Sequence, residues 1–161
     1  MATGYEYLER FKRVDASRGP LTTNGALTFD YVSLKNVVKA WIVVQLTQAV
    51  GHATIIQPKK ATLVDGTGVT NVVAVQRIRA NEDTAASDTE AVQTSAASYT
   101  VAADIKKKLI VIEIDPVSLG ETFDVLGCTT SASSQVTNFA SAHYVLQMKH
   151  QGATTSAVIT D

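Results

Sequence analysis

The side chains best able to do chemistry are a lone cysteine, Cys128, and the histidines His52, His143 and His150. A thiol becomes a nucleophile when a base and a positive environment stabilise the thiolate. No pair among these four residues has the short spacing of zinc ligands. Cys128 lies beside Leu126 in an apolar stretch, which favours a buried, inert thiol. His143 lies on a later predicted strand that could approach Cys128, so a Cys–His pair stays an alternative.

Two groups of carboxylates are the next candidates. Glu113 and Asp115 alternate on one predicted strand and so share a face, but acid–base catalysis also needs a cleft that perturbs their pKa values. Residues 81–90 hold four acids without a base, namely Glu82, Asp83, Asp88 and Glu90. The glycine of an EF-hand loop is missing, so we interpret this segment as a solvated loop rather than a calcium site.

Two glycines and three short basic clusters are the remaining candidates for a binding site. Gly66 and Gly68 precede a predicted strand, so they offer no helix N-terminus to a phosphate and indicate a hairpin turn. The basic clusters are short and lack interleaved aromatic residues, which argues against nucleic-acid binding. We interpret them as charges that guard strand ends against aggregation. These clusters are Lys59 with Lys60, Arg77 with Arg79, and Lys106 to Lys108.

These results predict a protein that is not an enzyme and has no catalytic, cofactor or metal site. The 161 residues suffice for one domain with a full core. Only 18% of them are charged and the net charge is −1, so no basic field attracts nucleic acid. One cysteine excludes an internal disulfide. No apolar run reaches a membrane span, and the N-terminus lacks the pattern of a signal peptide, so we expect no membrane association and synthesis in a cytoplasm.

Residues 109–116 form the element around which the chain is organised. Ile110, Ile112 and Ile114 alternate with Val111, Glu113 and Asp115, the pattern of a strand with one face in a core. We expect the isoleucines to pack against two other predicted strands, through Ile42 and Val44 of residues 37–47 and through Tyr144 and Leu146 of residues 135–149. Pro116 ends the strand, and Asp115 is expected to cap one helical turn that Gly120 closes.

About eight short strands without a clear helical period predict an all-β fold, an antiparallel β-sandwich of the jelly-roll kind. We expect a single domain over residues 27–161, preceded by an N-terminal arm and loop over residues 1–26. Pro58 is expected to end one strand because proline cannot donate to a ladder. The predicted strands cover residues 27–32, 37–47, 52–57, 61–64, 71–79, 109–115, 121–130 and 135–149. Within residues 91–101 we expect one or two short strands around Val92 and Tyr99.

The N-terminal arm supplies the candidate partner-binding residues Tyr5, Tyr7, Leu8 and Phe11. The spacing of Tyr5, Leu8 and Phe11 fits a short amphipathic helix, but no cap precedes it, so an extended arm is equally consistent. An arm of this kind orders against a neighbour and adds contact area.

Several segments together resemble the small virion-associated structural proteins of tailed bacteriophages, which include head-decoration, cement-like proteins. The segments are DYVSLKN at 30–36, WIVV at 41–44, DGTG at 65–68, LIVIEID at 109–115 with Leu119 and Phe123, and HYVL at 143–146. The resemblance covers roughly residues 27–150 and carries no functional residues. It implies a β-sandwich made in the host cytoplasm and located on the capsid surface of the virion, with the major capsid protein as partner.

The resulting hypothesis is a decoration protein that binds and stabilises the capsid shell as a homo-oligomer, with a trimer as one form. A surface poor in charge is consistent with extensive subunit contact. Two alternatives stay open. One is a minor tail or neck protein, and the other is a β-sandwich module that binds a receptor or carbohydrate, for which clustered exposed aromatic residues would be expected.

Overall fold

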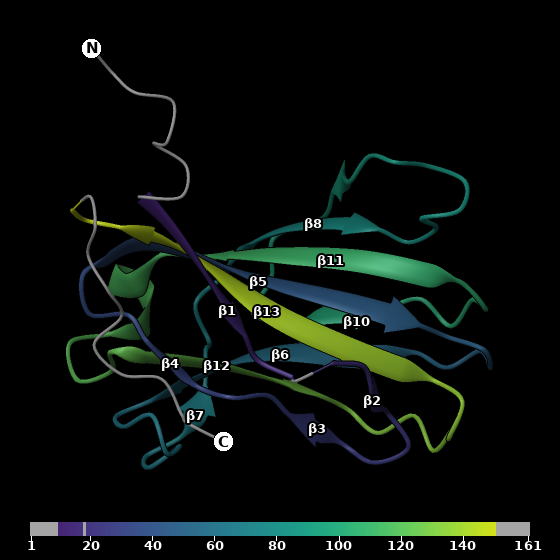
Figure 1. Cartoon of the computed structure of the whole chain (residues 1–161), viewed down its shortest axis with the longest axis horizontal. Helices are drawn as coiled ribbons and strands as arrows, with labels where there is room; N and C mark the ends of the chain where they lie inside the picture. The colour runs from purple at the N-terminus through teal and green to yellow at the C-terminus, as the bar shows by residue number, and fades with distance from the viewer. Residues whose placement is uncertain (1–9, 18, 151–161) are drawn as a thin grey trace.

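The computed structural model describes residues 10–17 and 19–150, which form two antiparallel β-sheets packed face to face (Figure 1). The predicted all-β sandwich is confirmed. A 3₁₀ turn, η1 (Pro116–Leu119), follows strand β11. The strands are β1 (Phe11–Asp15), β2 (Leu21–Thr22), β3 (Leu27–Thr28), β4 (Val32–Ser33), β5 (Val37–Thr47), β6 (Thr54–Ala61), β7 (Thr70–Asn71), β8 (Arg77–Asn81), β9 (Ala91–Val92), β10 (Tyr99–Val101), β11 (Lys107–Ile114), β12 (Val125–Thr130) and β13 (Phe139–Met148).

The strand order defines the two layers. Sheet A has the order β1-β13-β5-β11-β8-β9, with β2 also paired to β13. Sheet B has the order β10-β6-β12-β3, with β4 paired to β12 and β7 to β6. Three pairs join an early strand to a late one: β5 with β13, β6 with β12 and β8 with β11. Each pair encloses the next one in the sequence. This nesting is the jelly-roll-like feature of the sandwich.

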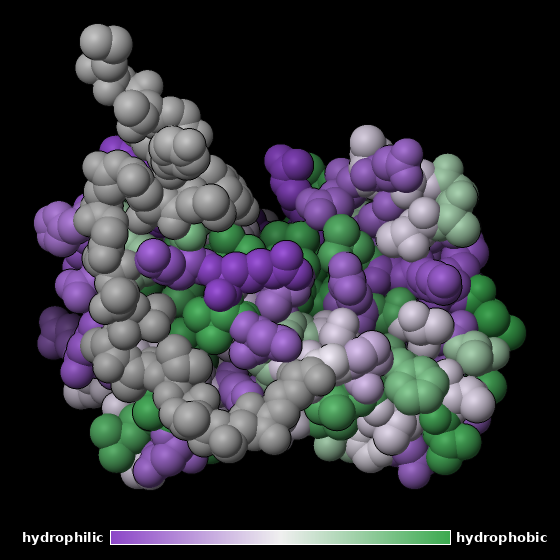
Figure 2. All heavy atoms as spheres, viewed as in Figure 1, coloured by the Kyte–Doolittle hydropathy of each residue, from purple (hydrophilic) through white to green (hydrophobic). Residues whose placement is uncertain are grey.

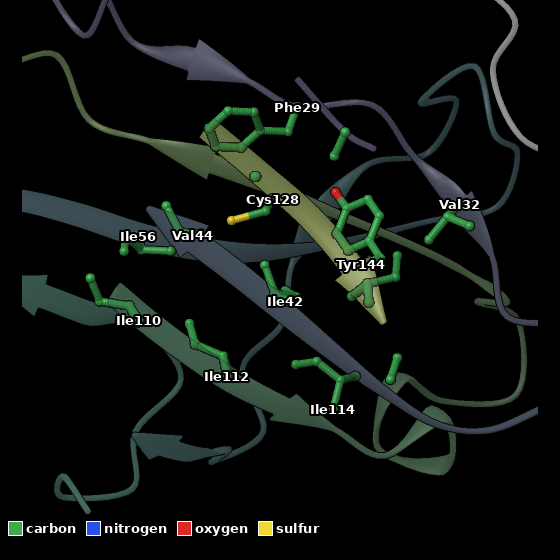
Figure 3. Packing of buried hydrophobic residues seen from close by; sticks show 14 of the residues in the cluster. Phe29, Val32, Ile42, Val44, Ile56, Ile110, Ile112, Ile114, Cys128 and Tyr144 are labelled. Atoms are coloured by element: carbon green, nitrogen blue, oxygen red, sulfur yellow. The ribbon is translucent and has the colours of Figure 1, made fainter. Parts of the chain in front are cut away.

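Strand β11 lies between β5 and β8, as expected for the organising strand. Its residues Ile110, Ile112 and Ile114 are fully buried. Ile112 pairs with Ile42 of β5, and Ile42 pairs on its other side with Tyr144 of β13. Figure 3 shows these side chains between the two sheets, in one core with Val44, Ile56 and Cys128. The predicted core is therefore confirmed.

The predicted cap after β11 is also confirmed. The Asp115 carboxylate accepts a hydrogen bond from the Val117 backbone N–H at 3.0 Å, and Pro116 occupies the first turn. Gly120 follows with φ of 94°, a left-handed value that favours glycine. The turn thus redirects the chain from sheet A toward β12 of sheet B.

The N-terminal boundary differs from the prediction. Strand β1 lies inside the segment predicted as an arm over residues 1–26, and it pairs with β13 from Phe11 to Asp15. Strand β2 also adds to β13 before residue 27. Strand pairing with a distant partner, which no local pattern reveals, brings this segment into the sandwich.

The prediction that Pro58 ends a strand is wrong. Strand β6 continues through Pro58 to Ala61 and pairs with β12 throughout. The carbonyl of Pro58 accepts from Val72 N–H, so its nitrogen also points away from β12. On that side β10 ends opposite Ile56 and β7 begins opposite Lys59. The backbone N–H that Pro58 lacks would therefore point into the gap between β10 and β7, so no hydrogen bond of the sheet is lost.

Gly127 marks a close contact on the outer side of sheet B. The ring of Tyr31 lies over this glycine, and a Cβ built on Gly127 would come within 2.3 Å of Tyr31 Cε1. Tyr31 packs there with Ala61 and Val125 in a second, smaller apolar cluster. Glycine inside β12 thus allows an aromatic ring to cover the strand.

Candidate partner-binding surface

The structure places the predicted partner-binding residues in two groups. Tyr5, Tyr7 and Leu8 lie outside the described residues. Phe11 is the first residue of β1, is partly buried, and packs its ring 6.1 Å from that of Trp41. Phe11 is therefore part of the sheet, which corrects its assignment to a free arm, because pairing of β1 with β13 fixes its backbone.

The outer face of sheet A presents two rows of side chains across neighbouring strands. Trp41 of β5, Glu113 of β11 and Arg77 of β8 form one row through cross-strand pairing. Val43, Val111 and Arg79 form the next row. These residues alternate with the buried ones along each strand, so the core pattern itself fixes which side chains face outward.

A trough of about 360 Å³ runs along this face. Trp41 and Val111 lie on the sheet side, and Val92 of β9 lines the opposite wall with Gln93 and Ser95. Val92 is 75% exposed. In Figure 1 the short teal strand β9 rises from the sheet beside β8, and Figure 2 shows the surface notched next to this hairpin, with apolar side chains at its base.

The single carboxylate that lines the trough, that of Glu113, pairs more closely with Lys39 than with Arg77. Glu113 accepts a hydrogen bond from Lys39 Nζ at 2.8 Å, which lowers the pKa of Glu113. Arg77 lies 4.0 Å from the same carboxylate and is 83% exposed. Arg79 makes no ion pair within residues 10–17 and 19–150. Glu113 thus pairs with two cations, Lys39 and Arg77, and Arg79 adds a positive charge to the trough.

Two segments that carry exposed valines are joined at the end of the sandwich where β11 stops. Val73 is 78%, Val75 67% and Val117 87% exposed. The buried side chain of Gln76 donates to Ser118 Oγ at 3.3 Å and to the Ala74 carbonyl at 3.0 Å. The bond to Ser118 joins the segment that carries Val73 and Val75 to the turn that carries Val117. We call these three residues the valine end.

The predicted inert role of Cys128 agrees with its position. Its side chain is fully buried between the sheets, and burial raises the pKa of the thiol to about 12. His143 lies on the outer face of sheet A, in the row with Asp15, so the strand separates it from Cys128. The alternative Cys–His pair is therefore not formed. Burial lowers the pKa of His143, and the nearby Arg13 acts in the same direction.

The remaining histidines do not assemble a site with these groups. His52 lies in the β5–β6 connection and His150 follows β13. In the part of the chain that the structure describes, no group of three or more His, Cys, Asp or Glu side chains could hold a metal ion. The described chain also contains no helix of the length and apolarity needed to cross a membrane.

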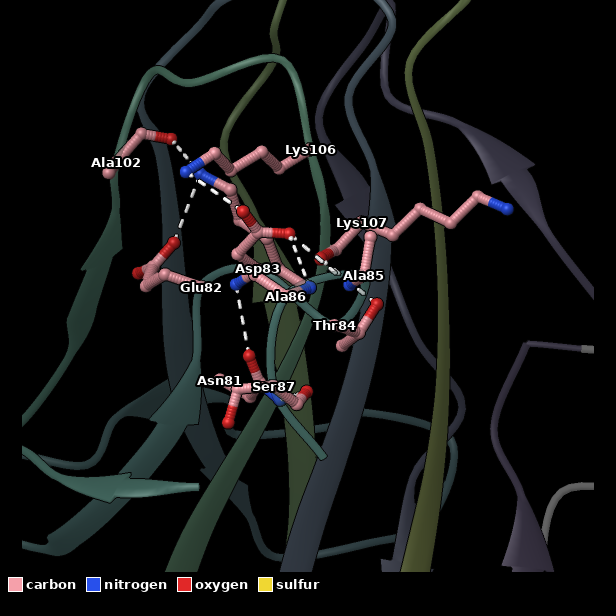
Figure 4. A network of polar contacts seen from close by, with 11 residues as sticks. Asn81, Glu82, Asp83, Thr84, Ala85, Ala86, Ser87, Ala102, Lys106 and Lys107 are labelled. Atoms are coloured by element: carbon pink, nitrogen blue, oxygen red, sulfur yellow. Dashed lines mark hydrogen bonds and ion pairs between the residues drawn. The ribbon is translucent and has the colours of Figure 1, made fainter. Parts of the chain in front are cut away.

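The acidic loop is bound to the lysine cluster, contrary to the interpretation of the loop as solvated and of the lysines as guards of strand ends (Figure 4). Asp83 pairs with Lys106 at 3.1 Å, and Glu82 pairs with Lys108 at 3.0 Å. Tyr99 Oη donates to the other oxygen of Glu82 at 2.6 Å. Lys108 is buried rather than guarding a strand end, because its position in β11 points inward with the isoleucines.

Comparison with known proteins gives no family. No family model and no curated protein matches the chain. The fold is similar to the crystal structure of the SPBc2 prophage-derived protein YomS, with 8% identity, 84% of this chain and 93% of that chain covered, and a TM-score of 0.47. A second match is a structure of infectious bursal disease virus, Gx strain, with 11% identity and a TM-score of 0.17. The match covers 84% of this chain and 36% of that chain.

Proposed function

We propose that the protein is a non-enzymatic structural component of a tailed-phage particle, a head-decoration protein that binds the major capsid protein of the assembled shell. The observation that carries the proposal is the valine end. Exposed apolar residues scattered singly are normal on a protein surface, whereas grouped ones mark contact sites. Val75 and Val117 each directly precede a residue of the Gln76–Ser118 hydrogen bond, which joins their two segments, and each of the three valines is at least two-thirds exposed.

The valine end is held in place before any partner binds. Gln76 connects its two segments through Ser118, and Asp115 caps the turn that carries Val117. A surface ordered in advance loses less conformational entropy on association than a loop that must become ordered. The valine end therefore suits repeated binding to identical positions on a shell.

The sequence supports the same function. The resemblance of residues 27–150 to virion-associated phage proteins implies the virion surface as the location and the host cytoplasm as the place of synthesis. The low charge, 18% of residues, favours extensive protein contact. We propose a homo-oligomer, with a trimer as the first form to test, because several shell contacts per particle raise avidity by about 10²–10⁴.

The test is binding of the purified full chain to shells of the parent phage that lack it, measured by co-sedimentation. We expect the wild-type chain to bind, and Val75→Ser with Val117→Ser to reduce binding at least about tenfold, as for a residue pair central to an interface. Val136→Ser is a matched control, since Val136 is 67% exposed in the loop before β13. Failure of the wild-type chain to bind would overturn the head assignment in favour of a tail or neck position.

A further inference from the structure

We infer that the N-terminal segment of the chain, residues 5–9, folds back across the outer face of sheet A and fills the trough of its own sheet. The inference goes beyond the proposed function, because it concerns contacts within one chain and not binding to a shell. It rests on the chemistry of the trough, on the sequence of the segment, and on the place where the segment joins β1.

The trough combines apolar surface with positive charge. Trp41 lies on its sheet side, and Val92, 75% exposed, lines its opposite wall. Arg79 makes no ion pair in the described part of the chain, and Arg77 has the 4.0 Å contact with Glu113. An occupant of matching chemistry therefore carries aromatic or aliphatic side chains together with a carboxylate.

Residues 5–9 have this composition. Their sequence is Tyr5, Glu6, Tyr7, Leu8 and Glu9. A tyrosine ring covers apolar surface while its hydroxyl reaches polar neighbours. A glutamate carboxylate matches the planar guanidinium of arginine with two parallel hydrogen bonds. The segment therefore offers apolar side chains to the tryptophan of the trough and the carboxylate of Glu6 to the arginines.

The described chain brings the start of this segment to the trough. Pairing with Gln147 fixes the backbone of Phe11, the first residue of β1. The ring of Phe11 lies beside Trp41 on the outer face of sheet A, with 6.1 Å between the two ring centroids. Since Trp41 itself lines the trough, residues 5–9 join the fold next to the trough that they are inferred to fill.

The segment is long enough to cross the trough. In sheet A, β5, β11 and β8 lie two, three and four strands from β1, which is about 10, 14 and 19 Å at the usual strand spacing. An extended chain places Leu8 up to about 10 Å from Phe11, Tyr7 up to about 14 Å and Glu6 up to about 17 Å. Leu8 therefore reaches β5 and Tyr7 reaches β11. The side chain of Glu6 spans the remaining distance to the arginines of β8.

Attachment to β1 favours the segment of the same chain over that of a second copy. A short tether holds a binding segment at an effective concentration in the millimolar range. The segment of a second copy competes with this local one, and its binding also costs the translational and rotational freedom of a whole molecule. The trough is therefore filled within the chain at protein concentrations well below the millimolar range.

The test is a charge exchange in the full chain, measured by acrylamide quenching of the fluorescence of Trp41, the only tryptophan. The segment variant is Glu6→Arg and the trough variant is Arg79→Glu. We expect each to raise the quenching constant at least about twofold, because like charges then face each other and the segment leaves Trp41. Combining the two substitutions restores opposite charges and is expected to return the constant at least about halfway to wild type.

Two matched controls change the charge without facing the arginines. Glu9→Arg makes the same exchange in the segment, but Glu9 extends at most about 7 Å from Phe11 and so does not reach β8. Lys107→Glu reverses an exposed charge of sheet A outside the trough. We expect both to leave quenching unchanged, and circular dichroism to show the same strand content in every variant. Equal effects of the controls would overturn the inference, as would failure of the combined variant to recover.

The dependence of quenching on protein concentration distinguishes the same chain from a second copy. We expect the quenching constant of the wild-type chain to stay the same as the protein is diluted. Protection of Trp41 that is lost on dilution would show that a second copy fills the trough, and would overturn the inference. Shell binding by Val75→Ser with Val117→Ser is measured separately, so either proposal can fail without the other.

Discussion

The ammonium group of Lys108 lies 3.0 Å from Glu82 Oε2, and no part of the lysine side chain is exposed. The same ammonium donates to the carbonyl of Ala102 at 2.6 Å, and Tyr99 donates to the other oxygen of Glu82. This ion pair joins the 81–90 loop to the start of β11. It takes the place of the solvent contact that a lysine at a strand end normally has.

Removing one partner of this pair is expected to destabilise the fold. Glu82→Gln leaves a fully buried ammonium without its counterion, and the usual cost is about 3–5 kcal/mol. We expect the lower end, about 3 kcal/mol, since Glu82 itself is 28% exposed. Urea unfolding measures the loss. Lys106→Met is the control, because its pair with Asp83 is at the surface and is worth at most about 1 kcal/mol. Equal losses would show that Lys108 is solvated in solution.

Truncation of the central strand tests the core. Ile112 is fully buried between Ile42 and Ile78 in sheet A, so Ile112→Ala is expected to lower the free energy of unfolding by about 2–5 kcal/mol. Val111 is the adjacent residue on the outer face and is only partly buried. Val111→Ala is expected to cost less. A loss below about 0.5 kcal/mol for Ile112→Ala, as at surface positions, would mean that the faces of β11 are reversed.

Gly127 and Tyr31 are expected to be energetically coupled. Gly127→Ala places a methyl group against the Tyr31 ring, and overpacking of this kind costs about 1–3 kcal/mol. In a Tyr31→Leu background the same substitution is expected to cost less, because the ring is gone. Gly25→Ala is the control, since no atom lies within 4 Å of a Cβ at that position. Additive losses in the double variant would contradict the contact.

Alkaline pH is expected to destabilise the fold through Cys128. Burial raises the pKa of this thiol to about 12 from an ordinary value of 9.0, so the folded state keeps a proton that the unfolded state releases. Stability is therefore fully present below pH 9 and falls as the pH rises toward 12. Urea unfolding at pH 8 and pH 10.5 measures this loss. We expect a smaller loss in Cys128→Ala, and an unchanged pH dependence would show that the thiol titrates normally.

The strand pattern of the core could be predicted from the sequence, because burial of one face imposes a period of two. Ile110, Ile112 and Ile114 show that period without interruption, and the structure buries all three. The cap at Asp115 could also be predicted, since the residues that form it are neighbours in the chain. Both features depend on residues that are close together in the sequence, so they can be predicted without knowledge of the tertiary contacts.

Features that depend on distant partners could not be predicted. Lys108 resembles its solvated neighbours in sequence, and the residue that pairs with it, Glu82, is 26 positions away. Pro58 stays in a strand because β10 and β7 leave a gap beside it. The trough is built from β5, β8, β9 and β11. The alternation of Arg77 with Arg79 was the only sequence signal that an exposed, cationic face was present.

The late position of β13 has a consequence for synthesis of the protein. Strand β5 ends at Thr47, but both of its partners, β11 and β13, lie far downstream, with β13 ending at Met148. At ribosomal rates of 5–20 residues per second, about 5–20 s pass between translation of these two strands. Until β11 has been translated, β5 has neither of its sheet partners, and until β13 follows it has only one. Sheet A is therefore completed only after β13 has left the ribosome, since β1, β2 and β5 all pair with it.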